Sequence, residues 1–118
     1  MSLDTYCVMG NPVEHSRSPW IHSRFAALTG QNLQYTRQLV PLDGFAQAVR
    51  TFAQAGGRGC NVTVPFKLEA AQCATTCSER VQLAAAANTL VFHDGAIHAD
   101  NTDGLGLVAD IQRNAGVP

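Results

Sequence analysis

Strand-like and helix-like segments alternate along the first half of the chain, and this order constrains the fold more than any other feature. Strand-like segments cover residues 5–10, 33–40 and 59–64, and helical patterns cover 18–30 and 43–57. Two strands of one sheet that are joined through a helix lie parallel and are connected by a right-handed crossover. Two such units in succession therefore predict a parallel sheet covered by helices.

The second half of the chain adds shorter elements. Residues 65–74 and 78–87 have the pattern of short helices, and residues 102–116 that of a longer one. Residues 88–93 and 96–100 flank Asp94–Gly95, a strong hairpin signal that adds one antiparallel strand. We expect helix caps and helix ends at Ser18, Asp43, Ser78, Gly30, Gly56–Gly57 and Gly116. The prediction is one α/β domain over residues 1–118, a three-layer α/β/α sandwich with a mixed, mostly parallel sheet.

Composition excludes several classes of function. Apolar residues make up 46% of the chain, which is typical of a globular domain, and the net charge of −1 argues against a nucleic-acid partner. The apolar runs are too short to cross a membrane and no signal peptide is recognisable, so we expect a cytoplasmic protein without a membrane partner. The four cysteines and four histidines lack metal-ligand spacing, which predicts reduced thiols and no metal site.

Polar clusters stand at four junctions between strands and helices. Residues 14–19, 61–67 and 100–104 lie where a predicted strand gives way to a helix, and residues 87–90 lie where a helix gives way to a strand. In open α/β sheets, ligands bind outside the carboxyl ends of the strands. The four loops are therefore predicted to form one pocket.

Each candidate residue in these loops also has a structural interpretation. Ser18 precedes Pro19 as a helix cap would, but with Ser16 it also suits a ligand carboxylate at a helix N-terminus. Asn88 follows an alanine-rich helix and could close it in the left-handed conformation. Asp103 could cap the last helix. These alternatives stay open on the sequence alone.

Lys67 is the hardest of these residues to explain structurally, although a surface position is an alternative. It stands where a helix is about to begin, and a helix N-terminus repels a cation. Pairing with Asp103 would offset this repulsion and hold the ammonium group in place. A lysine held in this way can exchange a proton with a substrate hydroxyl.

Four motifs together resemble the shikimate dehydrogenase family. They are "GNPVEHSRSPWIH", "GCNVTVPFK", "ANTL" and "DNTDGLG", in the family's order and at similar spacing over nearly the whole chain. The departures are small: Arg17 replaces a more usual Lys or Leu, and "AAAANTL" replaces "GAVNTL".

The resemblance implies an enzyme that reduces 3-dehydroshikimate to shikimate with NADP as cofactor, in the route to chorismate and aromatic amino acids. It implies a catalytic pair of Lys67 and Asp103. Ser16 and Ser18 would hold the substrate carboxylate, and the ring hydroxyls would be held by Thr63, Lys67, Asn88 and Asp103. It also associates Glu79 with the cofactor.

The chain carries no glycine-rich dinucleotide fingerprint after a strand, so the hydride donor lacks a recognisable site. We therefore expect the substrate-binding domain alone, without the Rossmann domain for NADP, and expect this chain to be inactive by itself. A quinate/shikimate dehydrogenase relative and a non-catalytic carboxylate-binding module are the alternatives. The sequence leaves open whether the chain forms a homodimer.

Overall fold

A computed structural model describes residues 4–30 and 33–102. Six strands form one sheet in the order β2-β1-β3-β5-β6-β4. Their bounds are β1 (Asp4–Gly10), β2 (Leu33–Leu39), β3 (Gly59–Val62), β4 (Thr76–Cys77), β5 (Thr89–His93) and β6 (Ala96–Asp100). Asp103, and the predicted helix over 102–116 apart from Thr102, lie outside the described residues.

The sheet is mixed and mostly parallel, as predicted. β1 pairs in parallel with both β2 and β3, and β4 pairs in parallel with β6. β5 runs antiparallel to both of its neighbours, and it is the one strand with this direction among those described. The antiparallel direction of β5 brings its first residue to the edge at which β1 and β3 end.

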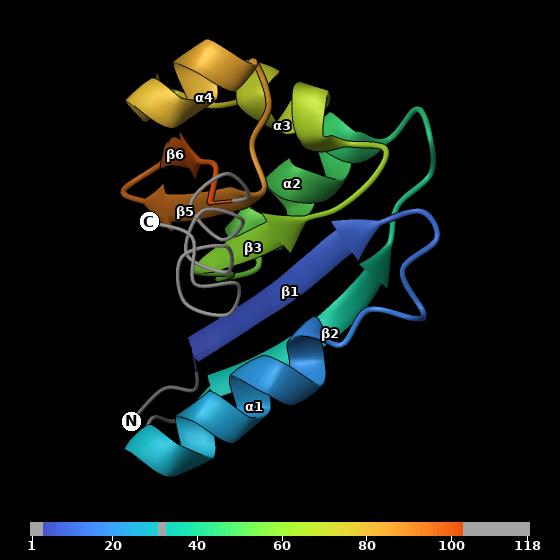
Figure 1. Ribbon diagram of the computed structural model, residues 1–118, viewed down its shortest axis with the longest axis vertical. Helices are drawn as coiled ribbons and strands as arrows, with labels where there is room; N and C mark the ends of the chain where they lie inside the picture. The colour runs from blue at the N-terminus through green and yellow to red at the C-terminus, as the bar shows by residue number, and fades with distance from the viewer. Residues whose placement is uncertain (1–3, 31–32, 103–118) are drawn as a thin grey trace, which may run out of the picture.

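Helices cover both faces of the sheet. Helix α1 (Ser18–Thr29) lies on one face, and α2 (Phe45–Gln54), α3 (Lys67–Gln72) and α4 (Glu79–Ala84) lie on the other (Figure 1). Because successive side chains of a strand point to opposite faces, β1 contributes to two separate clusters. Val8 packs with Val13 and Tyr35 in the smaller one, whereas Cys7 and Met9 belong to the larger one. This arrangement confirms the three-layer prediction.

The larger cluster fixes the start of α3. The rings of Phe45 from α2 and Phe66 just before α3 stack with centroids 5.1 Å apart, and both side chains are almost fully buried. The same cluster contains the buried thiols of Cys7 and Cys60, whereas Cys73 and Cys77 are half-buried, and all four cysteines are free. Burial of this apolar surface is the main favourable contribution to folding here.

Several local predictions are confirmed. The Ser78 hydroxyl caps α4 by accepting a hydrogen bond from the Val81 amide at 3.3 Å. Asp94 and Gly95 have φ angles of 49° and 80°, the left-handed pair that a tight two-residue hairpin needs. Gly30, directly after α1, has φ 71°, as expected for a glycine that ends a helix.

Two predicted helix caps are wrong. Gly44, rather than Asp43, precedes α2, and no side chain caps this helix. The amide of Gly44 instead donates to the Pro41 carbonyl, so a turn sets the entry to the helix. Ser18 is the first residue of α1 rather than its cap. The Ile21 amide donates to the carbonyl of Arg17, which stands one residue before Ser18, so the helical hydrogen bonds begin before Ser18.

The end of α4 and the position of β4 also differ from expectation. Ala85, with φ 56°, takes the left-handed position after α4, so Asn88 does not end this helix. β4 has two residues and was not predicted, since a strand this short carries no periodic pattern. No helix within residues 4–30 and 33–102 is long and apolar enough to span a membrane.

Candidate functional site

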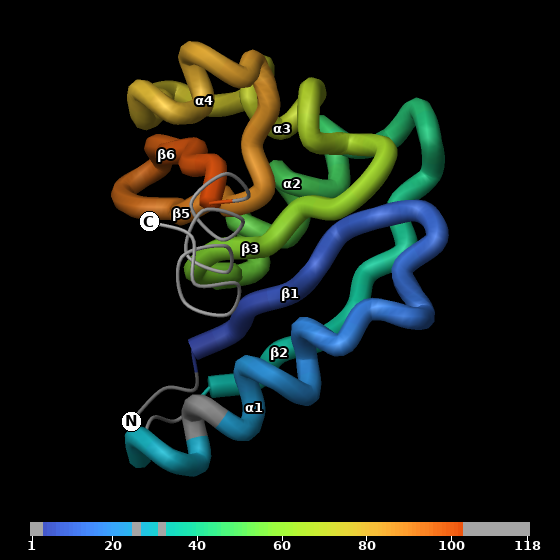
Figure 2. Tube along the Cα trace, viewed as in Figure 1, coloured from blue at the N-terminus to red at the C-terminus, as the bar shows by residue number. Residues whose placement is uncertain are grey.

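A small polar cavity lies at the edge of the sheet where β1 and β3 end. The chain leaves both strands on this side, and α1 and α3 begin there (Figure 2). The cavity has a volume of about 280 Å³ and is lined by Val8, Ser16, Ser18, His22, Asn61, Val62, Thr63, Lys67 and Asn88. Five of the six residues predicted to contact substrate therefore surround one cavity, and the sixth, Asp103, lies outside the described residues.

The loop after β1 is fixed at several points. The amide of Ser16 donates to the carbonyl of Val13, whose side chain is buried. The guanidinium of Arg37, on β2, donates to the Ser16 carbonyl at 2.6 and 2.9 Å. The Ser16 hydroxyl accepts from the Ser18 amide at 3.2 Å. Ser16 therefore keeps its hydroxyl hydrogen to donate to a ligand, at the point where α1 begins.

Thr63 and Lys67 follow β3. The amide of Thr63 donates to the Met9 carbonyl at 3.0 Å, which continues the pairing with β1 beyond the strand. A side chain on Gly10 would overlap the Thr63 methyl group, so the close approach of the two segments requires a glycine there. Lys67 directly follows the buried Phe66, and its carbonyl accepts from the Ala87 amide at 2.9 Å. Packing of the neighbouring residue thus holds the lysine backbone at the rim of the cavity.

Asn88 joins β3, β5 and β6. Its carbonyl accepts from the Val62 amide at 2.8 Å, and its amide donates to the Asp100 carbonyl at 3.1 Å. Its side chain binds Thr102 twice, donating to the Thr102 hydroxyl at 3.0 Å and accepting from the Thr102 amide at 3.1 Å. Asn88 therefore fixes the segment that leads directly to Asp103.

Two polar lining residues, His22 and Asn61, were not among the predicted site residues. Asn61 stands two residues before Thr63, and this period-two spacing on one strand was the available signal. His22 stands four residues after Ser18, which places both on the same side of α1. Burial of the His22 ring lowers its pKa from the ordinary value, so the ring is neutral at pH 7.

The charge of the cavity is simple. Lys67 carries the one formal charge among the described lining residues at neutral pH, and the other polar groups are hydroxyls, amides and a neutral imidazole. A cation beside several donors in a small cavity favours an anionic, hydroxyl-bearing ligand. Within residues 4–30 and 33–102, no group of three His, Cys, Asp or Glu side chains is placed to hold a metal ion.

Glu79 lies apart from these residues. It is exposed in the first turn of α4 and does not line the cavity. The next residue, Arg80, binds the Asp100 carboxylate.

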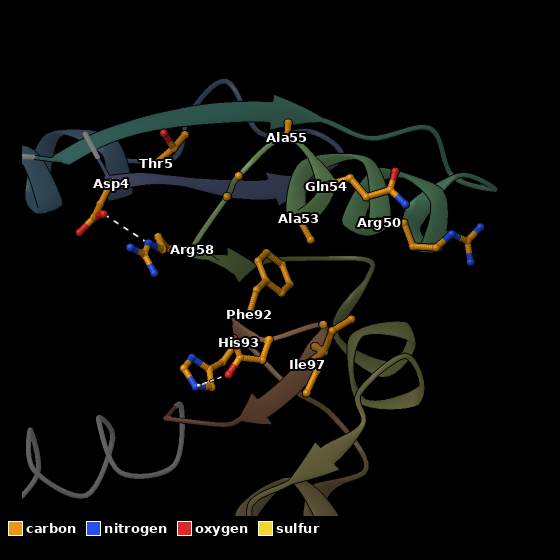
Figure 3. Close-up of a pocket in the computed structure, with 15 residues that line it drawn as sticks. Asp4, Thr5, Arg50, Ala53, Gln54, Ala55, Arg58, Phe92, His93 and Ile97 are labelled. Atoms are coloured by element: carbon orange, nitrogen blue, oxygen red, sulfur yellow. Dashed lines mark hydrogen bonds and ion pairs between the residues drawn. The ribbon is translucent and has the colours of Figure 1, made fainter. Parts of the chain in front are cut away.

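A larger hollow of about 830 Å³ lies at the opposite edge of the sheet (Figure 3). Arg58 in its lining is paired with Asp4 at 3.3 Å, and His93 Nε2 lies 3.1 Å from the Asp94 carboxylate. Arg50 points away from Phe92 and donates to Gln47. The five predicted residues that surround the smaller cavity do not contribute to this hollow, so the smaller cavity is the better candidate.

Comparison with known proteins identifies the family. The model of the shikimate dehydrogenase substrate binding domain matches residues 8–90. The chain belongs to the shikimate dehydrogenase family. This match includes all the lining residues of the small cavity, and it confirms the resemblance seen in the motifs.

Individual relatives and solved structures agree with this assignment. A relative named shikimate dehydrogenase (NADP(+)) from Acidovorax sp. (strain JS42) is 79% identical over 99% of this chain and 42% of its own length. An Ael1 enzyme from Pseudomonas putida is 49% identical with a TM-score of 0.93, over 98% of this chain and 42% of its own. The enzyme from Thermus thermophilus, solved with NADP(H) and shikimate, is 28% identical with a TM-score of 0.90. This match covers 98% of this chain and 44% of the Thermus chain. The chain thus spans about 42% of the curated relative's length.

Proposed function

We propose that this chain is the substrate-binding domain of an NADP-dependent shikimate dehydrogenase and that its small cavity holds shikimate and 3-dehydroshikimate. One observation carries the proposal: three separate segments of the chain contribute Ser16, Ser18, Thr63, Lys67 and Asn88 to the lining of the same cavity. The names of the relatives support the choice of substrate, since they are shikimate dehydrogenases.

The polar groups of the cavity match the parts of this substrate. In the proposal the hydroxyls of Ser16 and Ser18 hold the carboxylate at the start of α1. Thr63, Lys67, Asn88 and Asp103 hold the ring hydroxyls. The Lys67 ammonium also offsets the negative charge of the ligand, because it is the formal charge that the described lining supplies.

The proposed chemistry is reversible reduction of a ketone to an alcohol. The nicotinamide supplies the hydride, and the ketone oxygen gains negative charge as the hydride adds. Lys67 donates a proton to this oxygen in the reductive direction and accepts one from the hydroxyl in the oxidative direction. The Asp103 carboxylate orients the ammonium group and stabilises its charge.

We propose that residues 1–118 form the substrate-binding domain and that NADP is held mainly by a Rossmann domain outside this chain. The chain has no glycine-rich dinucleotide fingerprint, and the described residues of the cavity lining include no guanidinium group for a phosphate. Glu79, exposed on α4, is the proposed contact from this chain to the cofactor. We therefore expect the chain by itself to bind shikimate without turning over NADP.

The proposed setting is the cytoplasm, in the route to chorismate and aromatic amino acids. The charge of −1 gives no reason to propose a nucleic-acid partner, and we propose no membrane partner. A homodimer is the assembly to test, by sedimentation of the chain at several concentrations.

A shikimate titration followed by amide shifts of the isotope-labelled chain tests the binding proposal. We expect millimolar shikimate to shift the signals of Ser16, Thr63, Lys67 and Asn88, and to leave Arg50 and His93 at the far edge unchanged. Quinate, which carries one more hydroxyl, serves as the competing ligand. Absence of shifts around the cavity at millimolar shikimate would contradict the proposal, as would preferential binding of quinate. Oxidation of shikimate by the chain and NADP alone would contradict the expected inactivity.

A further inference from the structure

The phenol of Tyr35 is hydrogen-bonded to a residue of the cavity, Asn61. Tyr35 lies on β2, where 9% of the residue is exposed, and it donates its hydroxyl hydrogen to Asn61 Oδ1 at 2.6 Å. Burial raises the Tyr35 pKa from its ordinary value, so the phenol stays protonated at neutral pH. Its hydroxyl therefore links β2 to β3 through Asn61.

The ring of Tyr35 packs against several neighbouring side chains. His22 stacks on it with the ring centroids 4.5 Å apart and the planes 2° from parallel. Val8 and Val13 pack with Tyr35 in the smaller hydrophobic cluster. A buried ring held by a stacked neighbour and two branched side chains has little freedom to swing away, so its hydroxyl is a fixed reference point.

This fixed hydroxyl decides which way the Asn61 amide faces. An asparagine side chain has one oxygen that accepts and one nitrogen that donates twice. Asn61 Oδ1 accepts the short bond from Tyr35, whereas Asn61 Nδ2 makes only long contacts, 3.5 Å to the Asn88 carbonyl and 3.4 Å to the Thr89 hydroxyl. Turning the amide over would lose this short bond and would set Oδ1 against the Asn88 carbonyl oxygen, which is also an acceptor. The amide therefore keeps its donor side away from Tyr35, and Asn61 lines the cavity.

We propose that Tyr35 is a positioning residue, which acts through Asn61 to present an N–H donor to an oxygen of the bound substrate. This inference rests on the proposed function, because the oxygen belongs to the polyhydroxy carboxylate assigned to the cavity. Tyr35 itself does not line the cavity. Its role is to prevent the Asn61 carbonyl from facing the ligand, where it would repel an oxygen acceptor.

Tyr35→Phe tests the role, because it removes the hydroxyl and keeps the ring that stacks on His22. In the complete gene product we expect the KM for shikimate to rise roughly 2- to 13-fold, the effect of one ordinary hydrogen bond, with kcat nearly unchanged. Asn61→Ala should raise KM in the same way, and the double variant should be no worse than Asn61→Ala. Tyr6→Phe is the matched control, since Tyr6 lies in the same sheet but does not line the cavity, and its KM should stay at the wild-type value.

A second measurement needs no ligand. In the labelled wild-type chain, the Asn61 side-chain amide should show hydrogen-exchange protection, and Tyr35→Phe should move its signals toward those of an exposed asparagine. Unchanged Asn61 signals, an unchanged KM, or KM increases that multiply in the double variant would each overturn the role of Tyr35. If the wild-type chain fails to bind shikimate, the proposed function fails, and the ligand-free spectra still decide whether Tyr35 sets Asn61.

Discussion

The Arg80 guanidinium binds both oxygens of the Asp100 carboxylate, with Nη2 2.8 Å from Oδ2 and 2.9 Å from Oδ1. The Ser78 hydroxyl donates to the same carboxylate at 2.8 Å, and the Asn101 amide donates to it at 2.7 Å. Arg80 also donates to the Asn101 carbonyl at 3.1 Å. These bonds tie the start of α4 to the end of β6, three residues before the proposed catalytic Asp103.

Asp100→Asn should lower the free energy of unfolding by roughly 1 to 2 kcal/mol. This value lies between that of an exposed ion pair and that of a fully effective charged hydrogen bond, because Asp100 is only partly buried. Urea unfolding of both proteins measures the change. Asp4→Asn is the matched control, since its ion pair with Arg58 is more exposed and should contribute less than about 0.5 kcal/mol. Equal losses in the two variants would contradict the special role of Asp100.

The contribution of Asp100 to stability should disappear in acid. Hydrogen bonds from Arg80 and Ser78 lower the pKa of Asp100 from 3.8 to about 2 in the folded protein. Between these values the unfolded chain binds more protons than the folded one, so the contribution is present above pH 3.8 and is lost as the pH falls toward 2. The difference in unfolding free energy between wild type and Asp100→Asn should therefore narrow over this range. A constant difference between pH 3.8 and pH 2 would show that the carboxylate charge is not its cause.

His22 should make the domain less stable in mild acid. Burial lowers the His22 pKa below 6.5, so the folded protein resists protonation that the unfolded chain accepts. Stability is then unaffected above pH 6.5 and decreases as the pH falls from 6.5 toward the lowered value. His22→Phe keeps an aromatic ring against Tyr35 and removes the titrating group. Thermal unfolding between about pH 7.5 and pH 5 should show a smaller acid loss in this variant than in wild type, and an equal loss would exclude His22 as its source.

Lys67→Met should separate catalysis from binding. The change keeps most of the side-chain length and removes the proton donor, so in the complete gene product turnover should fall about 100-fold or more. The affinity for shikimate should fall much less, because the other side chains proposed to contact the ligand remain around the cavity. Steady-state kinetics together with shikimate titration measure both quantities. Leu68→Ala, at the exposed neighbouring position, should leave both near wild type. Unchanged turnover with a large loss of affinity would instead favour a binding module.

Much of the fold follows from local sequence patterns. The alternating strands and helices, the Asp94–Gly95 turn and the Ser78 cap each depend on residues within a few positions, and the structure agrees with them. The wrong caps have a local cause as well, since the turn at Pro41–Gly44 replaces the expected Asp43 cap. The two-residue strand β4 forms because Thr76 and Cys77 meet the distant strand β6, which no local pattern reveals.

The same division holds for the site. The sequence by itself determined which residue types follow each strand, and its motifs indicated Ser16, Ser18, Thr63, Lys67 and Asn88 as ligand contacts. Only the tertiary structure decided that these side chains share a cavity with His22 and Asn61. Tyr35 and Asn61 are 26 residues apart, and they meet because β1 pairs with both β2 and β3, which brings the two outer strands into one sheet. A hydrogen bond between strands depends on register and on the face to which each side chain points, and the packing of the whole sheet sets both.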